Sequence, residues 1–229
     1  LLKMAHPNWK LTPYKTNLKW EDVINAQSIV GKSYIQSTNP IYLSLAGGSY
    51  DPETKEYIQK EAGGWYAANK ETVAYYIDPR NFLDELSLFM FENLGYNKEY
   101  QTIDVINGIF NNTKLLEYSK YYVEAATYNG NSISPVSLAA RSRQEVVIKN
   151  GELSDSATGE TGYYNFYNIG AFSSCINPVS CALDYATRKN WTTPEISIKE
   201  GATLIAKDYI NQKQNTLYFQ RWNVTSNNY

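Results

Sequence analysis

The stretch SPVSLAARSRQEV, residues 134–146, carries the clearest fold signal in this sequence. Ser134 followed by Pro135 is typical of a helix start, because a serine side chain caps free backbone N–H groups and proline fits the first turn. On a helical wheel at about 100° per residue, Leu138 and Glu145 fall on a second face, away from the main apolar side. A helix that is apolar on more than one face is usually buried between other elements, so the stretch predicts a helix inside a helical core.

Helix signals occur along the whole chain. A capping residue followed by proline occurs again at Asn177-Pro178 and at Thr193-Pro194. Asp78-Pro79 separates two helical pieces, because proline is unfavourable inside a helix. Apolar residues at helical spacing predict further helices within residues 20–30, 69–77, 83–90, 103–110 and 115–126. The predicted fold is therefore mainly α.

The remaining segments predict a smaller irregular or β portion. Residues 40–50 are typical of an extended segment and turn, and DPETKEYIQKEAGGW, residues 51–65, predicts a turn, a short polar helix and a Gly-Gly break. The Gly-, Ser- and Thr-rich stretch 150–165 predicts a loop or hairpin, and we expect the β portion near 150–172. The fold class is thus α+β, with helices dominant.

The composition excludes several classes of function. The chain has one histidine, His6, whereas Ser/His/Asp and Cys/His hydrolases need a positioned imidazole and zinc sites need several ligands. No GxGxxG or GxxxxGK[ST] motif supports nucleotide chemistry. The net charge of −2 argues against a nucleic-acid partner, and the sequence lacks an apolar run of about 18 residues that would span a membrane. We therefore expect no metal, no cofactor, no nucleic acid and no membrane, and chemistry based on carboxylates, tyrosines and amides.

Three further features bear on the protein's context. The first residues, LLKMAHPNWK, lack an initiator methionine, which suggests a piece of a longer protein. Cys175 and Cys181 either form a disulfide in an oxidising compartment or are a free pair, and the sequence leaves both open. Tyrosine occurs 21 times and tryptophan 5 times, and their flat faces with polar edges suit sugar binding as well as packing.

Two interpretations compete for Glu145. Arg141 lies one helical turn earlier, and the pattern by itself favours an Arg141–Glu145 ion pair on a solvated face. Alternatively, a carboxyl group held beside apolar residues stays protonated more readily, which is what a general acid needs to protonate a glycosidic oxygen. An adjacent guanidinium would oppose this by lowering the pKa of the carboxyl group, so the second interpretation predicts that Arg141 points away from Glu145.

A segment rich in aromatic and amide residues follows, GETGYYNFYNIGAF, residues 159–172. Aromatic faces can stack on the C–H side of sugar rings, and amides can bond N-acetyl and hydroxyl groups. The alternative is an aromatic-rich strand that packs on the core. Glu160 is the candidate second carboxylate, with Asp155 in the same loop as the alternative. The candidate substrate-binding residues are Tyr163, Tyr164, Tyr167, Asn168 and Asp155.

These stretches together resemble a known family. SPVSLAARSRQE followed by GETGYYNFYNIGAF is similar to the bacterial cell-wall N-acetylglucosaminidases of glycoside hydrolase family 73, of the clostridial autolysin type. The C-terminal WTTPEISIKEGATLIAKDYI and QNTLYFQRWNV resemble that family's last helix and the segment after it. The resemblance covers roughly residues 100–229, and its three motifs occur in the family's order. The N-terminal half resembles segments that often precede this core in clostridial wall hydrolases.

The resemblance implies a lysozyme-like helical core at residues 99–229, with a small β-hairpin or loop lobe. Residues 1–98 would form an added N-terminal, mainly helical lobe of the same catalytic unit. The implied activity is an endo-β-N-acetylglucosaminidase, which hydrolyses the β-1,4 bond after N-acetylglucosamine in peptidoglycan glycan strands. The implied context is that of a secreted bacterial autolysin of the cell wall, active in cell separation or wall turnover. We expect a monomer that needs no metal.

The resemblance also assigns roles to single residues. Glu145 matches the family's general acid, and Glu160 lies where a second acidic residue is often proposed. Tyr164, Tyr167 and Asn168 match positions that line the glycan cleft. After protonation of the leaving oxygen, three routes stay open: a water activated by a carboxylate, attack by the substrate's N-acetyl oxygen, or attack by a carboxylate.

Two other functions remain open from the sequence. The first is a muramidase or lytic transglycosylase, which cleaves the same polymer with one glutamate carried on a helix. The second is a wall-binding module without catalytic activity. The reducing end of the product separates the first from a glucosaminidase, and the loss or retention of lysis in Glu145→Gln separates the second.

Overall fold

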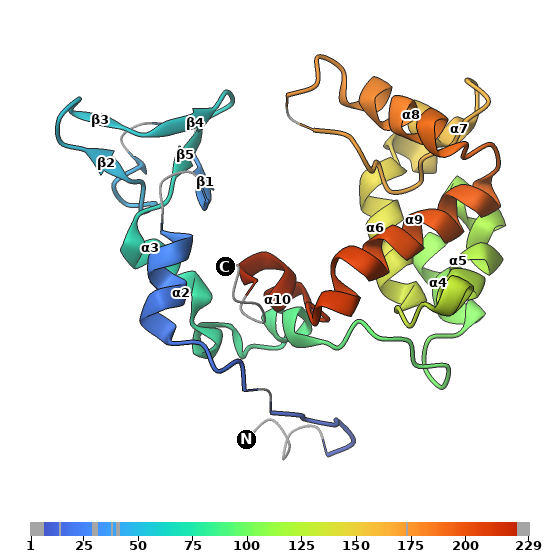
Figure 1. The fold of residues 1–229 in the computed structure, drawn as a ribbon, viewed down its shortest axis with the longest axis horizontal. Coiled ribbons are helices and arrows are strands. Elements are labelled where there is room, and N and C mark those ends of the chain that lie inside the picture. Colours follow the sequence, from blue (N-terminus) through green and yellow to red (C-terminus); the bar gives the residue numbers. More distant parts are fainter. Residues whose placement is uncertain are drawn as a thin grey trace. The chain divides into compact units, whose positions relative to one another are not determined.

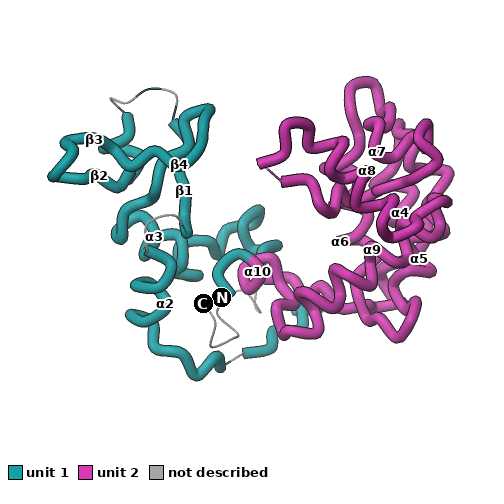
Figure 2. Tube along the Cα trace, turned by 45° about the horizontal axis from the view of Figure 1, so that its top comes forward, with its two compact units in different colours: residues 1–90, 221–229 teal, residues 91–220 magenta. Residues whose placement is uncertain are grey.

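The computed structural model describes residues 7–13, 15–28, 32–37, 39, 42–172 and 174–223. The chain separates into two compact units (Figure 2). Unit 1 comprises residues 1–90 and 221–229, and unit 2 comprises residues 91–220. The break after residue 90 lies close to the predicted boundary after residue 98, whereas the last residues join unit 1 rather than the C-terminal unit. That the two units act as functional domains stays a prediction.

The described part of unit 1 contains two α-helices, α2 (Trp20–Gln27) and α3 (Lys70–Ile77) (Figure 1). The first prediction extended to residue 30, but residues 29 and 30 lie outside the described part of the chain. Helix α3 begins where expected, because the Asn69 side chain accepts a hydrogen bond from the Thr72 backbone N–H at 2.8 Å. This cap satisfies one of the free donors of the first turn.

The five named strands of the described residues all lie in unit 1. A three-stranded antiparallel sheet has the order β1-β5-β4, and β2 pairs with β3 in a second sheet. Their bounds are β1 Tyr34–Gln36, β2 Tyr50–Asp51, β3 Glu56–Tyr57, β4 Gln59–Glu61 and β5 Trp65–Ala67. The polar helix predicted within residues 51–65 is therefore wrong, and the N-terminal lobe combines its helices with short strands. Gly63 and Gly64 adopt positive φ angles in the turn before β5, so turn geometry and strand pairing outweigh the helix preference of Glu and Lys.

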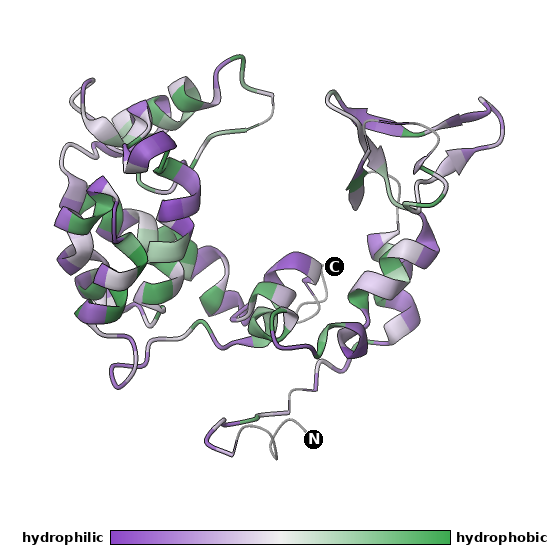
Figure 3. Cartoon of the chain, turned by 180° about the vertical axis from the view of Figure 1, so that it is seen from behind, coloured by the Kyte–Doolittle hydropathy of each residue, from purple (hydrophilic) through white to green (hydrophobic). Residues whose placement is uncertain are grey.

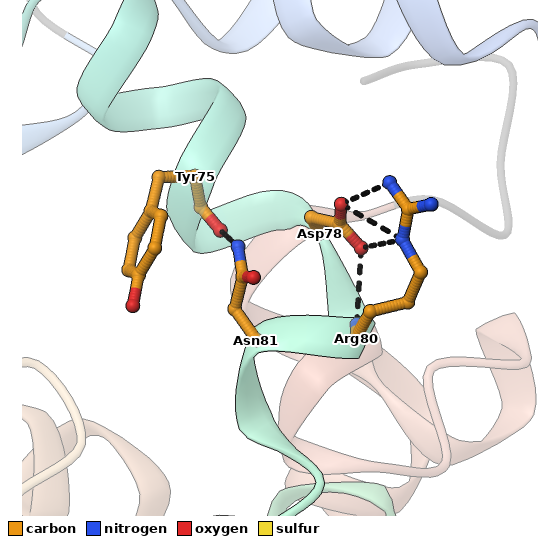
Figure 4. Close-up of polar contacts among 4 residues, drawn as sticks. All are labelled: Tyr75, Asp78, Arg80 and Asn81. Atoms are coloured by element: carbon orange, nitrogen blue, oxygen red, sulfur yellow. Dashed lines mark hydrogen bonds and ion pairs between the residues drawn. The ribbon is translucent and has the colours of Figure 1, made fainter.

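The predicted helix break at Asp78-Pro79 is confirmed. Figure 4 shows the Asp78 carboxylate accepting hydrogen bonds from the backbone N–H of Arg80 at 3.0 Å and from its guanidinium. The amide of Asn81 donates to the Tyr75 carbonyl at 2.9 Å. These contacts satisfy the end of α3 and hold the chain in its new direction.

The helix predicted within residues 83–90 is wrong. After the 3-10 helix η2 (Pro79–Phe82), the chain there forms only one further short 3-10 helix, η3 (Ser87–Phe91). Leu86 is 83% exposed and Phe89 is 58% exposed, so these apolar residues do not bury a helical face. Most helical stability in proteins comes from packing such a face, which explains why the spacing alone does not produce a longer helix.

Unit 2 consists mainly of helices (Figure 1). Helix α5 packs on α9 and α4 packs on α6. Its α-helices are α4 Ile103–Phe110, α5 Ser119–Ala125, α6 Pro135–Val146, α7 Asp155–Thr158, α8 Pro178–Lys189 and α9 Pro194–Asp208. Helix α10 Leu217–Trp222 begins in unit 2, and its last two residues belong to unit 1. The 3-10 helices are η4 Lys114–Tyr118, η5 Tyr128–Gly130, η6 Lys149–Gly151 and η7 Ile210–Gln212. The mainly α fold with some β-structure is thereby confirmed.

Three capping predictions are confirmed in unit 2. The side chains of Ser134, Asn177 and Thr193 each accept a hydrogen bond from a backbone N–H in the first turn, and proline follows each. The helices enclose one core, in which the rings of Phe110 and Tyr122 meet edge to face with centroids 4.9 Å apart. Figure 3 shows hydrophobic residues gathered within the helical bundle, with hydrophilic residues around it.

Two predictions for unit 2 need correction. The β portion expected near residues 150–172 is absent from the described residues of that segment, apart from a single bridge between Val147 and Leu153. The short helix α7 occupies part of it instead. Leu138 does not lie on a second face of α6, because it belongs to the buried side together with Ala139 and Val146. Burying a leucine side chain contributes about 1.5–3 kcal/mol, so this side fixes the rotation of α6.

Candidate active site

Glu145 occupies the last turn of α6, beside the point where that helix is anchored. Val146 is completely buried and the neighbouring Glu145 is exposed. The general-acid interpretation expected apolar residues to surround this carboxyl group, but without a bound ligand the carboxyl group is open to solvent. The core residue next to Glu145 fixes the helix end, while the carboxyl group itself lies at the surface, where a ligand can reach it.

Neither arginine of α6 neutralises Glu145. Among the described residues, no ion pair within 4.0 Å joins Arg141 or Arg143 to that carboxylate. The guanidinium of Arg141 lies over the Tyr209 ring, 6.0 Å from its centroid. Arg143 donates to the backbone carbonyl of Ile109. The structure thus agrees with the expectation that Arg141 points away from Glu145, and it contradicts the surface ion pair that the sequence pattern favoured.

Asn168 connects the aromatic and amide-rich segment to the end of α6. Its Nδ2 donates to the backbone carbonyl of Glu145 at 2.7 Å. Asn168 adopts a left-handed conformation with φ of 49°, which asparagine tolerates better than most residues. Its Oδ1 is buried and has no hydrogen-bond partner among the described residues. The Asn168 amide therefore positions the backbone of Glu145, and its role in binding substrate stays a prediction.

Tyr167 is a core residue, which contradicts the prediction that it lines a glycan cleft. It is 2% exposed, and its hydroxyl donates to the Ile198 carbonyl of α9 at 3.2 Å. A Cβ atom on Gly201 would come within 2.5 Å of its ring, so this glycine leaves the space that the ring fills. Burial raises the pKa of Tyr167 well above its ordinary value. The alternation of aromatic residues in the sequence cannot distinguish this buried ring from its surface neighbours.

Asn165 is also structural rather than sugar-binding. It is fully buried, and its Nδ2 donates to the carbonyls of Ile169 and Ala182, each at 2.8 Å. Its Oδ1 accepts from the Ile169 backbone N–H at 3.1 Å. The side chain therefore ties the segment to α8 and holds the turn that presents Asn168.

Tyr163 and Tyr164 keep part of their surface exposed and remain candidates for ligand contact. The Tyr164 ring stacks parallel to Phe166, with centroids 6.2 Å apart and planes 6° apart. Tyr118, from η4, packs edge to face on the same Phe166 at 5.1 Å. Burial, followed by the nearby Glu117 carboxylate, raises the pKa of Tyr118 to about 12. Tyr118 carries no signal for this role in the sequence, because only the folded helices bring η4 beside this segment.

Of the two candidates for the second carboxylate, Asp155 is the first residue of the short helix α7, and Glu160 follows the glycine that ends it. Both are exposed. The backbone N–H of Glu160 donates to the Thr158 hydroxyl at 3.5 Å, while neither carboxylate makes an ion pair with a described residue. Their assignment as second catalytic group stays a prediction.

A disulfide joins Cys175 and Cys181, with Cα atoms 6.4 Å apart. It decides the question that the sequence left open, and it ties the loop after the aromatic segment to the first turn of α8. Within the described ranges, no group of three or more His, Cys, Asp or Glu side chains is placed to hold a metal ion.

The sequence of the chain is similar to bacterial wall enzymes. A beta-N-acetylglucosaminidase of Bacillus subtilis is 32% identical over 170 residues, which are 71% of this chain and 19% of that protein. A bifunctional autolysin of Staphylococcus epidermidis is 29% identical over 178 residues, which are 74% of this chain and 13% of that protein. The chain is a homologue of these glucosaminidases and autolysins. It spans less than a fifth of the length of either relative, and no protein-family model matches it.

Solved structures show the same fold. A major bifunctional autolysin matches 92% of this chain and 79% of its own, with a TM-score of 0.59 and 23% identity. Autolysin E of S. aureus, crystallised with a muropeptide, matches 92% of this chain and 81% of its own, with a TM-score of 0.55 and 22% identity. This autolysin-type fold is consistent with the resemblance to glycoside hydrolase family 73.

Proposed function

We propose that this chain is an endo-β-N-acetylglucosaminidase that hydrolyses the β-1,4 bond after N-acetylglucosamine in bacterial peptidoglycan, with Glu145 as general acid. The observation that carries the proposal is the setting of Glu145. It is an exposed carboxylate without a cationic partner among the described residues, and its backbone is bonded to Asn168 of the aromatic segment. The names of the related proteins support the choice of substrate and bond.

In the proposed reaction, protonated Glu145 donates its proton to the leaving glycosidic oxygen as positive charge develops on the sugar ring. Because the protein does not shield Glu145, bound glycan would exclude water from it. The exposed parts of Tyr163 and Tyr164 would support the sugar. The positive charge is met by a water that Glu160 or Asp155 activates, by the substrate's N-acetyl oxygen, or by a carboxylate nucleophile. The route through an activated water requires the two carboxyl groups to lie about 6.5–9.5 Å apart, whereas direct attack by a carboxylate requires a separation of about 5–5.5 Å.

The test is digestion of purified peptidoglycan by wild type and by Glu145→Gln, with the products identified by mass spectrometry. Loss of a general acid costs about a hundredfold or more in rate, so Glu145→Gln is expected to lose at least that much. Glu152→Gln is the matched control, because it removes an exposed glutamate that pairs with Lys114 at 2.5 Å. Lysis at the wild-type rate by Glu145→Gln would refute the assignment.

The reducing ends of the products distinguish the glucosaminidase from a muramidase or transglycosylase. New reducing N-acetylglucosamine supports the proposal, whereas muramic acid ends or their anhydro form refute it. The third possibility, a wall-binding module, predicts that wild type and Glu145→Gln bind wall equally and release nothing.

We also propose that the protein acts as a monomer outside the membrane, in the cell wall. The Cys175–Cys181 disulfide supports an oxidising compartment, because such bonds persist mainly in secreted proteins. In the part of the chain that the structure describes, no helix has the length and apolar character needed to cross a bilayer. Light scattering after size-exclusion chromatography checks the monomer, and a mass of twice 26.1 kDa would contradict it.

A further inference from the structure

A hollow of about 420 Å³ lies within unit 1, and none of its lining residues has a role in the reaction proposed above. One side is formed by Ser33 and strand β1, and another by helix α3. Arg221 and Trp222, the last residues of α10, complete the lining. Its volume lies within the range of about 300–1,000 Å³ that is typical of small-molecule sites.

Trp222 is a buried residue that is held in place at the side of this hollow. It is 6% exposed, and its backbone carbonyl accepts a hydrogen bond from Gln27 of α2 at 2.9 Å. The guanidinium of Arg221 lies over the Trp222 ring, 4.3 Å from its centroid. A guanidinium that stacks through its face keeps its N–H donors in the plane free for another partner.

No described carboxylate neutralises Arg221. It forms no ion pair within 4.0 Å with any described residue, and it is the one charged side chain among the residues that line the hollow. Arg80, in the same unit, shows the usual alternative, because its guanidinium is held by Asp78 (Figure 4). The free donors of Arg221 therefore favour an anionic ligand, and a planar carboxylate matches their geometry.

Ser33 provides a second, independent indication of a ligand. It is 4% exposed, and its Oγ is buried without a hydrogen-bond partner among the described residues. Its carbonyl accepts from the Ala68 backbone N–H at 2.9 Å, so the residue is fixed beside the hollow. Leaving a buried hydroxyl without a partner is unfavourable, and a bound ligand removes that cost.

We propose that this hollow binds a carboxylate carried by an amino sugar or by a short peptide. Arg221 binds the carboxylate, Ser33 bonds a second polar group, and the rings of Tyr34 and Tyr76 contact the apolar side of the ligand. The choice of ligand rests on the proposed function. Peptidoglycan offers this chemistry from two sources, the lactyl carboxylate of muramic acid where the stem peptide has been removed and the carboxylates of the stem peptides themselves.

Isothermal titration calorimetry of the whole chain with three probes tests the proposal. N-acetylmuramic acid presents the lactyl carboxylate, and N-acetylmuramyl-L-alanyl-D-isoglutamine presents a peptide carboxylate. N-acetylglucosamine, which has no carboxylate, is the control ligand. We expect one or both acids to bind more tightly than N-acetylglucosamine, and the acid that binds identifies the source. Equal affinity for all three, or no binding of either acid, would overturn the proposal.

Two variants test the residues. Arg221→Gln is expected to weaken binding of the acid about tenfold to a hundredfold, because a hydrogen bond to a charged group is lost. Arg80→Gln is the matched control and should bind like wild type, since Arg80 lies outside the lining of the hollow. Ser33→Ala should weaken binding about twofold to tenfold without lowering the stability of the free protein. Wild-type affinity in Arg221→Gln would refute the site.

The same titration with Glu145→Gln separates this inference from the proposed function. Glu145 does not line the hollow, so its substitution should leave acid binding unchanged. If the acids bind while peptidoglycan is not cleaved, the proposed function fails and the site stands. If peptidoglycan is cleaved at N-acetylglucosamine while neither acid binds, the function stands and the site fails.

Discussion

Replacing Asn165 by alanine tests the conclusion that this amide holds the aromatic segment rather than a sugar. The side chain is fully buried and makes three hydrogen bonds to backbone groups, at 2.8, 2.8 and 3.1 Å. The partners are the Ile169 carbonyl, the Ala182 carbonyl and the Ile169 N–H. Alanine removes all three bonds and leaves these partners in a site with little access to water.

The expected loss of stability follows from these contacts. A protein hydrogen bond contributes about 1 kcal/mol net, and a buried partner left unsatisfied costs about 1–3 kcal/mol. Part of the sum is recovered as the segment relaxes, so we expect Asn165→Ala to lower the free energy of unfolding by about 3–5 kcal/mol. This is a large fraction of the total stability of a typical domain, about 5–15 kcal/mol.

Urea denaturation followed by circular dichroism measures this change. Asn111→Ala is the control, because Asn111 is exposed and its side chain makes no hydrogen bond to a described residue. The free energy of unfolding of this variant should differ from that of wild type by less than about 0.5 kcal/mol. A loss below about 1 kcal/mol in Asn165→Ala, together with a large loss of activity, would show that Asn165 contacts substrate instead.

Three further predictions follow from the same unit. Asn168→Ala removes the bond to the Glu145 carbonyl, so we expect about tenfold lower kcat on peptidoglycan with KM little changed, and an unchanged kcat would contradict the positioning role. Gly159→Ala places a Cβ atom 2.3 Å from Tyr164 Cζ at a φ of +78°, and should cost about 1–3 kcal/mol in urea denaturation, whereas unchanged stability would show that the ring moves freely. The folded-state pKa of Tyr118 is raised from 10.0 to about 12, so its contribution to stability is fully present below pH 10 and is lost as the pH rises toward 12. Tyr118→Phe should therefore lose less stability than wild type as the pH rises toward 12. An ultraviolet titration that shows Tyr118 ionising near pH 10 would contradict the raised pKa.

Local signals in the sequence predicted those elements whose ends are set within a few residues. Ser134, Asn177 and Thr193 cap their helices, and Asp78-Pro79 ends one, because capping bonds and the geometry of proline act over a single turn. The predictions failed where a local preference competed with distant partners. The charged residues before Gly63 favour a helix in isolation, but in the folded unit they pair as strands.

The sequence alone was enough to predict the class of the protein and to single out one carboxylate as the candidate general acid. The helical periodicity, the single histidine and the order of three motifs led to a mainly α glycosidase-like chain and to Glu145. The roles of residues within the aromatic segment depend instead on how the helices pack around it. Tyr167 and Asn165 face the core, whereas Tyr164 stays partly exposed, because burial depends on what α8 and α9 pack against each residue. The unpaired Arg221 beside Ser33 is likewise a product of folding, since these residues lie at opposite ends of the chain.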